Sequence, residues 1–139
     1  MLSEDRFDEA ISDYDNAARI APQNPKYFHA KGIAYEAIAA KIEKCDGKQK
    51  RFDQEELPVE KRYADDMQSY LREDYLQNCK SAIEQYKKAI GVDENFYQSR
   101  FHLGRCLAQI FNYTEAIKHY KKIIETQEKK RNFQELMYV

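Results

Sequence analysis

The sequence predicts an all-α fold, and three features of the chain indicate it. Its 139 residues include only four glycines and three prolines, which leaves few breaks for a fold of short strands and turns. Ala, Glu, Lys, Gln, Leu and Ile, all of which tolerate helix well, are abundant. Apolar residues also recur at steps of three and four positions, as on one face of a helix. With 42% apolar and 34% charged residues, the chain can form one domain or one stretch of a longer array.

A short motif, Ala-Ile followed three residues later by Tyr, occurs three times. Its copies are Ala10-Ile11 with Tyr14, Ala82-Ile83 with Tyr86, and Ala116-Ile117 with Tyr120. The second and third copies are 34 positions apart. Gly32 lies 22 positions after Ala10 of the first copy, and Gly104 lies 22 positions after Ala82 of the second. Two coincident spacings of this kind predict a repeated helical unit.

These two glycines, Gly32 and Gly104, fall in the middle of predicted helices. Glycine there costs about 1 kcal/mol relative to alanine. Glycines at matching positions therefore predict helix–helix contacts too close for a Cβ atom. Pro22 and Pro25 predict the end of one helix and the start of the next.

The residues of this repeat resemble the tetratricopeptide repeat, whose 34-residue unit is a pair of antiparallel helices, A and B. Phe28, Gly32 and Tyr35 match helix A of one unit, and Gly104 with Leu107 matches helix A of the next. Helix B appears three times, near residues 6–20, 79–91 and 114–127. The resemblance covers roughly two thirds of the chain and implies a right-handed α-solenoid. Two residues depart from the family pattern: Lys31 stands at a usual Leu and Arg100 at a usual large aromatic residue.

The spacing divides the chain into successive units. We expect 1–24 to be the C-terminal half of a unit (its helix B), 25–96 a unit with an inserted helical arm at about 41–78, 97–130 another unit, and 131–139 the start of a further or capping helix. The insertion adds 38 residues between helices A and B of the second unit. Its periodicity predicts one long helix from about 58 to 90, forming an extended helical hairpin arm. The arm either projects from the solenoid or folds back onto it as additional core.

The two ends of the chain are apolar. The first helix B lacks its own helix A, so we expect Phe7, Ile11 and Tyr14 to be exposed. The last residues, 136–139, are also apolar. Terminal repeats of a solenoid normally turn a polar face outward. The chain is therefore either part of a longer array or a protein whose ends dock onto something, including a second copy.

Composition and motifs exclude several classes of function. The 23 basic and 24 acidic residues are interspersed, whereas a nucleic-acid-binding protein gathers basic residues on one face. No run approaches the roughly 18 apolar residues of a membrane span. Three cysteines without a framework spacing (Cys45, Cys79 and Cys106) predict a reducing, cytoplasmic location. His102 and Cys106 share one helical face, but two ligands are too few for zinc. We expect neither a cofactor nor an enzyme.

The resemblance implies that the A helices line a concave face that binds other proteins. The residues expected on that face are Lys26, His29, Ile33 and Glu36 from one unit and Gln98, Phe101, Arg105 and Gln109 from the next. This mixed surface suits an extended or helical peptide with some acidic character. The clamp that some members use to hold chaperone tails needs Lys, Asn and Arg at positions that are occupied here by other residues.

The sequence thus predicts a scaffold module that binds a partner protein within a larger assembly. Two alternatives remain open. The chain could be a structural element that self-associates through its incomplete end repeats. It could also be the regulatory domain of a longer enzyme.

Overall fold

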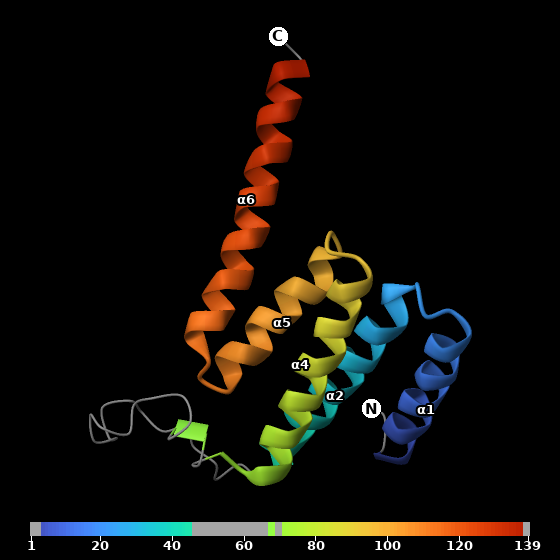
Figure 1. Ribbon diagram of the computed structural model, residues 1–139. Helices are drawn as coiled ribbons and strands as arrows, with labels where there is room; N and C mark the ends of the chain where they lie inside the picture. The colour runs from blue at the N-terminus through green and yellow to red at the C-terminus, as the bar shows by residue number, and fades with distance from the viewer. Residues whose placement is uncertain (1–3, 46–66, 69–70, 138–139) are drawn as a thin grey trace.

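The computed structural model describes residues 4–45, 67–68 and 71–137. These residues form α1 (Glu4–Ile20), α2 (Pro25–Cys45), α4 (Glu73–Val92), α5 (Tyr97–Gln109) and α6 (Tyr113–Met137). Among the residues described there is no strand, and the predicted all-α class is confirmed. Each helix packs mainly against the helices next to it in this order, so that the five form a solenoid (Figure 1).

Local sequence explains where the helices begin. The side-chain oxygen of Asn24 accepts a hydrogen bond from the backbone N–H of Lys26 at 3.0 Å, which caps the start of α2. Two acidic residues, Glu73 and Asp74, occupy the first turn of α4, where they interact favourably with the helix dipole. Between α5 and α6, Phe111 takes a left-handed backbone conformation with φ 67°. The N–H of Asn112 then bonds the carbonyl of Leu107 at 2.8 Å and closes the end of α5.

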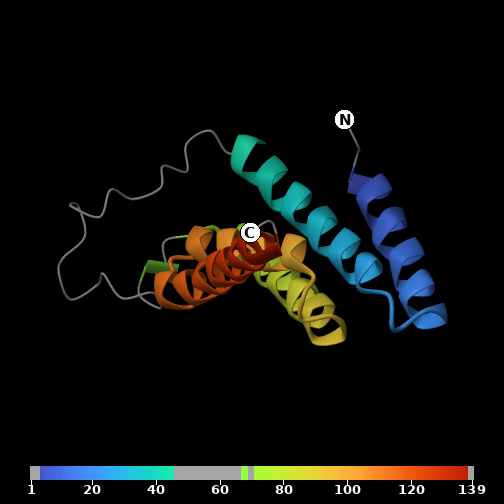
Figure 2. The same cartoon turned by 90° about the horizontal axis from the view of Figure 1, so that it is seen from above.

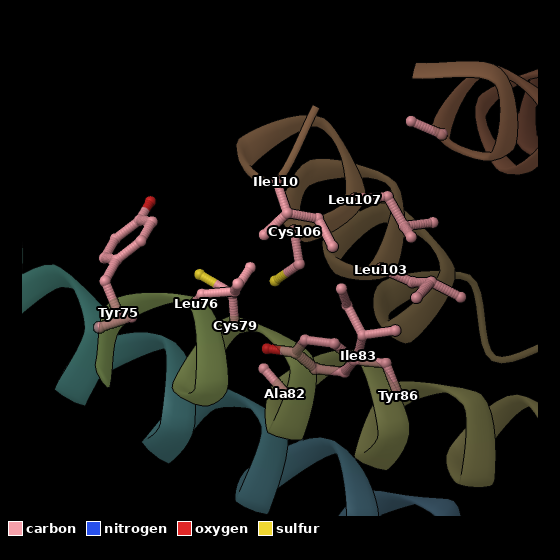
Figure 3. Close-up of a cluster of buried hydrophobic side chains, with 12 residues drawn as sticks. Tyr75, Leu76, Cys79, Ala82, Ile83, Tyr86, Leu103, Cys106, Leu107 and Ile110 are labelled. Atoms are coloured by element: carbon pink, nitrogen blue, oxygen red, sulfur yellow. The ribbon is translucent and has the colours of Figure 1, made fainter. Parts of the chain in front are cut away.

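The core lies where α4 meets α2 and α5 (Figure 3). Its buried members are Ala39 from α2, Tyr75, Leu76, Cys79, Ala82, Ile83 and Tyr86 from α4, Leu103, Cys106, Leu107 and Ile110 from α5 and its C-cap, and Ala116 from α6. The alanine and tyrosine of the second motif copy, Ala82 and Tyr86, are completely buried. These motif residues therefore lie on a buried helix face, as their spacing predicted.

Both mid-helix glycines lie against a tyrosine of the same helix pair. A Cβ atom on Gly32 would stand 2.4 Å from the ring of Tyr86, and one on Gly104 would stand 2.9 Å from the ring of Tyr120. Neither distance leaves room for a methyl group. The predicted close contacts are thus confirmed in both pairs.

The two departures from the family pattern are buried and paired. The ammonium group of Lys31 in α2 forms an ion pair with Asp15 in α1. The guanidinium of Arg100 in α5 contacts His119 Nδ1 in α6 at 3.2 Å and donates to the carbonyl of Glu94 at 3.3 Å. Each long cation therefore links two neighbouring helices, because its charged end reaches a partner on the adjacent one.

Three predictions about the helices were wrong. The helix expected from about 58 to 90 is interrupted, because the chain bends at Leu71 and Arg72 is extended (φ −60°, ψ 135°) before α4 begins. Residues 131–137 continue α6 and do not start a further helix. Phe7 is buried at 8% exposure, because its face of α1 packs against the following helix α2.

Part of the predicted arm lies outside the described residues, namely 46–66 and 69–70. The two described residues between these segments lie against the solenoid. Met67 is buried, and the side-chain amide of Gln68 donates to the carbonyl of Ile110 at 2.9 Å. At residues 67–68 the chain therefore packs onto the corner between α5 and α6.

Replacing the two packed glycines by alanine should have unequal effects. We expect Gly32→Ala to lower the free energy of unfolding by about 1–3 kcal/mol, because Tyr86 is fully buried and has nowhere to move. We expect Gly104→Ala to change it little. Tyr120 is only partly buried and can shift, while alanine gains about 1 kcal/mol of helix propensity. Urea unfolding followed by circular dichroism measures both values.

Gly91 supplies the matched control, since a Cβ atom there meets nothing within 4 Å. Gly91→Ala should be neutral or stabilising by up to about 1 kcal/mol. An equal loss of stability in all three variants would contradict the packing argument.

Candidate binding surface

The predicted concave-face residues lie on two helices, as expected from their positions. Lys26, His29, Ile33 and Glu36 lie on α2, and Gln98, Phe101, Arg105 and Gln109 lie on α5. They differ in how far they reach solvent. Lys26, Ile33, Gln98, Phe101 and Arg105 are exposed, whereas His29, Glu36 and Gln109 are half-buried. The structure thus divides them into residues open to a partner and residues held within the protein.

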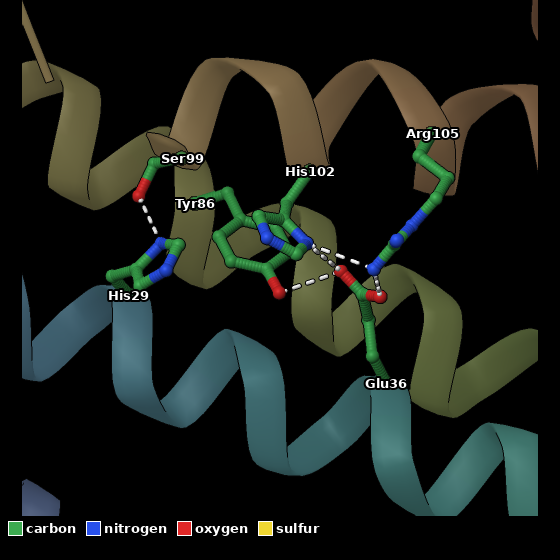
Figure 4. A network of polar contacts seen from close by, with 6 residues as sticks. All are labelled: His29, Glu36, Tyr86, Ser99, His102 and Arg105. Atoms are coloured by element: carbon green, nitrogen blue, oxygen red, sulfur yellow. Dashed lines mark hydrogen bonds and ion pairs between the residues drawn. The ribbon is translucent and has the colours of Figure 1, made fainter. Parts of the chain in front are cut away.

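Glu36 is the centre of a polar network that joins three helices (Figure 4). Its carboxylate accepts a hydrogen bond from the Tyr86 hydroxyl of α4 at 2.6 Å. It also forms an ion pair with the guanidinium of Arg105 on α5, and it lies 3.2 Å from His102 Nδ1 on the same helix. Because α2 and α5 have few other contacts with each other, these bonds are a principal link between the two.

The electrostatics of this network keep Glu36 charged at neutral pH. Burial alone would raise the pKa of its carboxyl, but hydrogen bonds from Tyr86, Arg105 and Cys106 outweigh burial and lower the pKa. Burial and the bond to Glu36 together raise the pKa of Tyr86 far above its usual value. The hydroxyl therefore remains protonated and donates to the carboxylate.

His29 continues the contact between α2 and α5. Its Nδ1 lies 2.8 Å from the hydroxyl of Ser99, which is completely buried. The His29 ring also packs against Phe96 and His102, at centroid distances of 5.4 and 5.2 Å. Burial, and then the neighbouring His102, lower the pKa of His29, although Glu36 opposes this. The ring is therefore neutral at pH 7.

Phe101 and Ile33 are the exposed apolar side chains of the surface. Phe101 is 50% exposed, and its ring makes T-shaped contacts with the rings of His102 and Tyr120 at centroid distances of 5.8 and 6.1 Å. Ile33 is 38% exposed. Since the network around Glu36 holds His102, the Phe101 ring rests against one fixed side chain and offers an apolar contact there.

Sequence reasoning missed the network itself. The sequence indicated His102 only as a possible metal ligand, and it indicated no polar role for Tyr86 or Ser99. The one available signal was the accumulation of His, Glu and Arg on two neighbouring A helices. Cys106, which shares a helical face with His102, is completely buried, and burial raises the pKa of its thiol. Within the described ranges no group of three or more His, Cys, Asp or Glu residues could hold a metal ion.

Comparison with known proteins identifies one part of the chain. Residues 97–130, which include α5 and most of α6, match the family model described as tetratricopeptide repeat. Among solved structures, the crystal structure of MamA is similar, with 22% identity and a TM-score of 0.38 over 93% of each chain. No curated protein sequence matches significantly. None of the described helices combines the length and apolar character that a membrane span requires.

The stability of the protein should fall in mild acid. The folded state holds the pKa of His29 below 6.5, and that of His119 is lowered by burial and by Arg100. The unfolded chain therefore binds more protons as the pH falls through about 6.5, and the free energy of unfolding decreases. Urea titrations from pH 7.5 down to pH 5, around the unfolded histidine pKa of about 6.5, should show this decrease.

The double variant His29→Asn/His119→Asn removes both titrating groups. Its stability should depend less on pH over this range than that of the wild type. A wild-type stability that is flat or rises toward acid would contradict the prediction. His29→Asn alone should remove only part of the slope.

Proposed function

We propose that this chain, whose residues 97–130 match the tetratricopeptide repeat model, is a protein–protein interaction module that binds a peptide or helical segment of a partner protein on the face of α2 and α5. The observation that carries the proposal is the exposed Phe101 ring of α5, which packs against His102, a side chain that the network around Glu36 holds in place. A half-exposed aromatic side chain with fixed neighbours is typical of residues that anchor a partner. The protein would act as a scaffold within a larger assembly.

The proposal includes the arrangement of the units. In it, α1 is helix B of an incomplete unit (1–24), α2 and α4 form a unit interrupted by the insertion (25–96), and α5 and the first part of α6 form the next (97–130). The repeated glycine–tyrosine contacts support this division, since they pair α2 with α4 and α5 with α6. A cytoplasmic location belongs to the same proposal, and the burial of the cysteine side chains Cys79 and Cys106 within the core suits a reducing compartment.

The geometry changes the expected chemistry of the partner. Arg105 is engaged by Glu36 and is not an unpaired cation awaiting an acidic group. An acidic side chain of a partner would have to compete with Glu36 for it. Lys26 and Gln98 remain exposed at the start of their helices. The partner segment is therefore expected to place an apolar side chain on Phe101, with hydrogen bonds and any acidic group playing a secondary part.

Self-association through the first helix is less favoured than the sequence suggested. That alternative needed an exposed apolar face on α1, and Phe7 and Ala18 of that face are buried. The most exposed large apolar side chain of α1 is Ile20, a single residue at the helix end. Isolated exposed apolar residues of this kind are normal on protein surfaces.

Phe101→Ser should weaken binding of a partner peptide. Peptides selected against the wild-type chain from a displayed random library serve as the probe, and their dissociation constants are measured by fluorescence anisotropy. We expect the loss to reach about tenfold, equivalent to about 1.4 kcal/mol, because the anchor contact is removed. Helicity by circular dichroism should be unchanged, since the side chain is half-exposed. Ile20→Ser, which removes a still more exposed apolar side chain on α1, should leave the affinity unaltered. Equal weakening by both variants would refute the role of Phe101.

Glu36→Gln should increase binding of acidic peptides. The neutral amide keeps the shape of the side chain and can still accept the Tyr86 hydroxyl, but it no longer neutralises Arg105. We expect peptides that carry Asp or Glu to bind several-fold more tightly to the variant at pH 7, with a stronger dependence on salt. In the double variant Glu36→Gln/Arg105→Gln the gain should vanish. Unchanged affinity in Glu36→Gln would show that Arg105 takes no part in recognition.

A further inference from the structure

One ring nitrogen of His102 faces two groups with opposite hydrogen-bonding requirements (Figure 4). His102 Nδ1 lies 2.9 Å from the guanidinium of Arg105, which can only donate hydrogen bonds. The same atom lies 3.2 Å from the carboxylate of Glu36, which can only accept them. Without a proton, Nδ1 accepts from Arg105, and with a proton it donates to Glu36. The nitrogen therefore satisfies one of these two neighbours at a time.

The charge of His102 decides which of the two contacts can form. A neutral imidazole with its proton on Nε2 accepts the bond from Arg105, so that His102 and Glu36 hold the guanidinium together. An imidazolium carries a proton on both ring nitrogens, and its Nδ1–H then meets a guanidinium of the same charge. Protonation therefore removes one bond from Arg105 and adds a repulsion, while it gives Glu36 a second cationic partner.

Arg105 is the member of this group that can move away. Its side chain is 45% exposed, whereas the side chains of Glu36 and His102 are 13% and 22% exposed. When Arg105 leaves, Glu36 keeps its bonds from the Tyr86 hydroxyl and the Cys106 thiol. With a protonated imidazole beside it, the buried carboxylate still has donors and a counter-charge. The departure of Arg105 therefore leaves no unpaired charge inside the protein.

The other titratable groups beside His102 and Arg105 are uncharged at pH 7. They are His29 on α2, Tyr86 on α4, Cys106 on α5 and Tyr120 on α6. Burial raises the pKa of both tyrosines and of the thiol, so mild acid leaves them neutral. Burial lowers the pKa of His29, so this ring gains its proton at a lower pH than an ordinary histidine does. Glu36 stays ionised, because its hydrogen bonds lower the pKa of its carboxyl.

We propose that His102 is a proton-controlled switch of the α2–α5 face. When His102 takes up a proton it becomes the cation paired with Glu36, and the released guanidinium of Arg105 binds a carboxylate of the partner segment. Histidine suits this role because its charge changes between about pH 5 and 8. Arg105 lies one helical turn after Phe101, so one segment can reach both side chains. The inference rests on the function proposed for this face.

The test measures how pH changes the affinity of an acidic peptide. A histidine-free peptide selected against the wild-type chain is made with Glu at each position in turn, and with Gln at the same position as its control. Peptide Glu stays ionised at pH 5.5, since its ordinary pKa is about 4.3. We expect a Glu form to bind about threefold to fivefold more tightly at pH 5.5 than at pH 7.5 in fluorescence anisotropy. Its Gln form should change little.

The chain has three histidines, and single variants separate their effects. His102→Asn should abolish the gain, because asparagine does not titrate. Each variant is compared with itself at the two pH values, so a shift in its basal affinity does not matter. His119→Asn is the matched control and should keep the gain, since α6 lies apart from α2 in the row of helices (Figure 2). Circular dichroism at pH 5.5 checks that each variant stays folded.

The release of Arg105 can also be measured without a partner. In NMR spectra of the labelled chain, the Nε–H signal of Arg105 should shift as the ring signals of His102 titrate, and it should shift much less in His102→Asn. Binding that depends on Phe101 but shows no gain for any Glu peptide would overturn the switch and leave the proposed function intact, as would a gain that persists in His102→Asn. Peptide binding that does not depend on Phe101 at either pH would refute the proposed function, and the switch with it.

Discussion

The side chain of Tyr86 on α4 contacts both α2 and α5, and the arrangement of these three helices depends on it. Its ring fills the space that the missing side chain of Gly32 leaves on α2, and it stacks on His102 of α5. A buried tyrosine hydroxyl needs an acceptor, which is Glu36. A buried carboxylate in turn needs a cation, which is Arg105. The burial of one tyrosine of α4 is therefore accompanied by an ion pair between α2 and α5.

The contacts that every unit shares could be predicted from the sequence, and those that occur once could not. The pairing of Gly32 with Tyr86 and of Gly104 with Tyr120 follows from matching positions in a repeated unit. The network around Glu36 has no such signal, because the position equivalent to Glu36 in the next unit is Ala108. Comparison of a chain with itself detects packing that recurs, whereas a polar contact at a single junction depends on three-dimensional positions that no spacing encodes.

The wrong predictions have physical causes of the same kind. Phe7 was expected to be exposed on the assumption that a B helix buries its apolar face against its own A helix. In the structure this face of α1 packs against α2 of the following unit, so that Phe7 is buried although α1 has no A helix before it among the described residues. Helical periodicity also cannot show that a helix is continuous. The break before α4 is indicated instead by the acidic first turn at Glu73 and Asp74, which suits a helix N-terminus.

The α2–α5 face and the exposed side of α6 offer a ligand different interactions. On the α2–α5 face Glu36, Arg105 and His29 are already paired, so at neutral pH a ligand gains little from charge and relies on Phe101. On α6, Ile117 and Ile124 are 50% and 56% exposed. Completing the burial of each would contribute roughly half of the 1.5–3 kcal/mol that a fully exposed side chain gains, before the cost of association is subtracted. Binding on α6 would therefore depend on apolar area, whereas binding on the α2–α5 face would depend on one aromatic side chain among polar groups that are already paired.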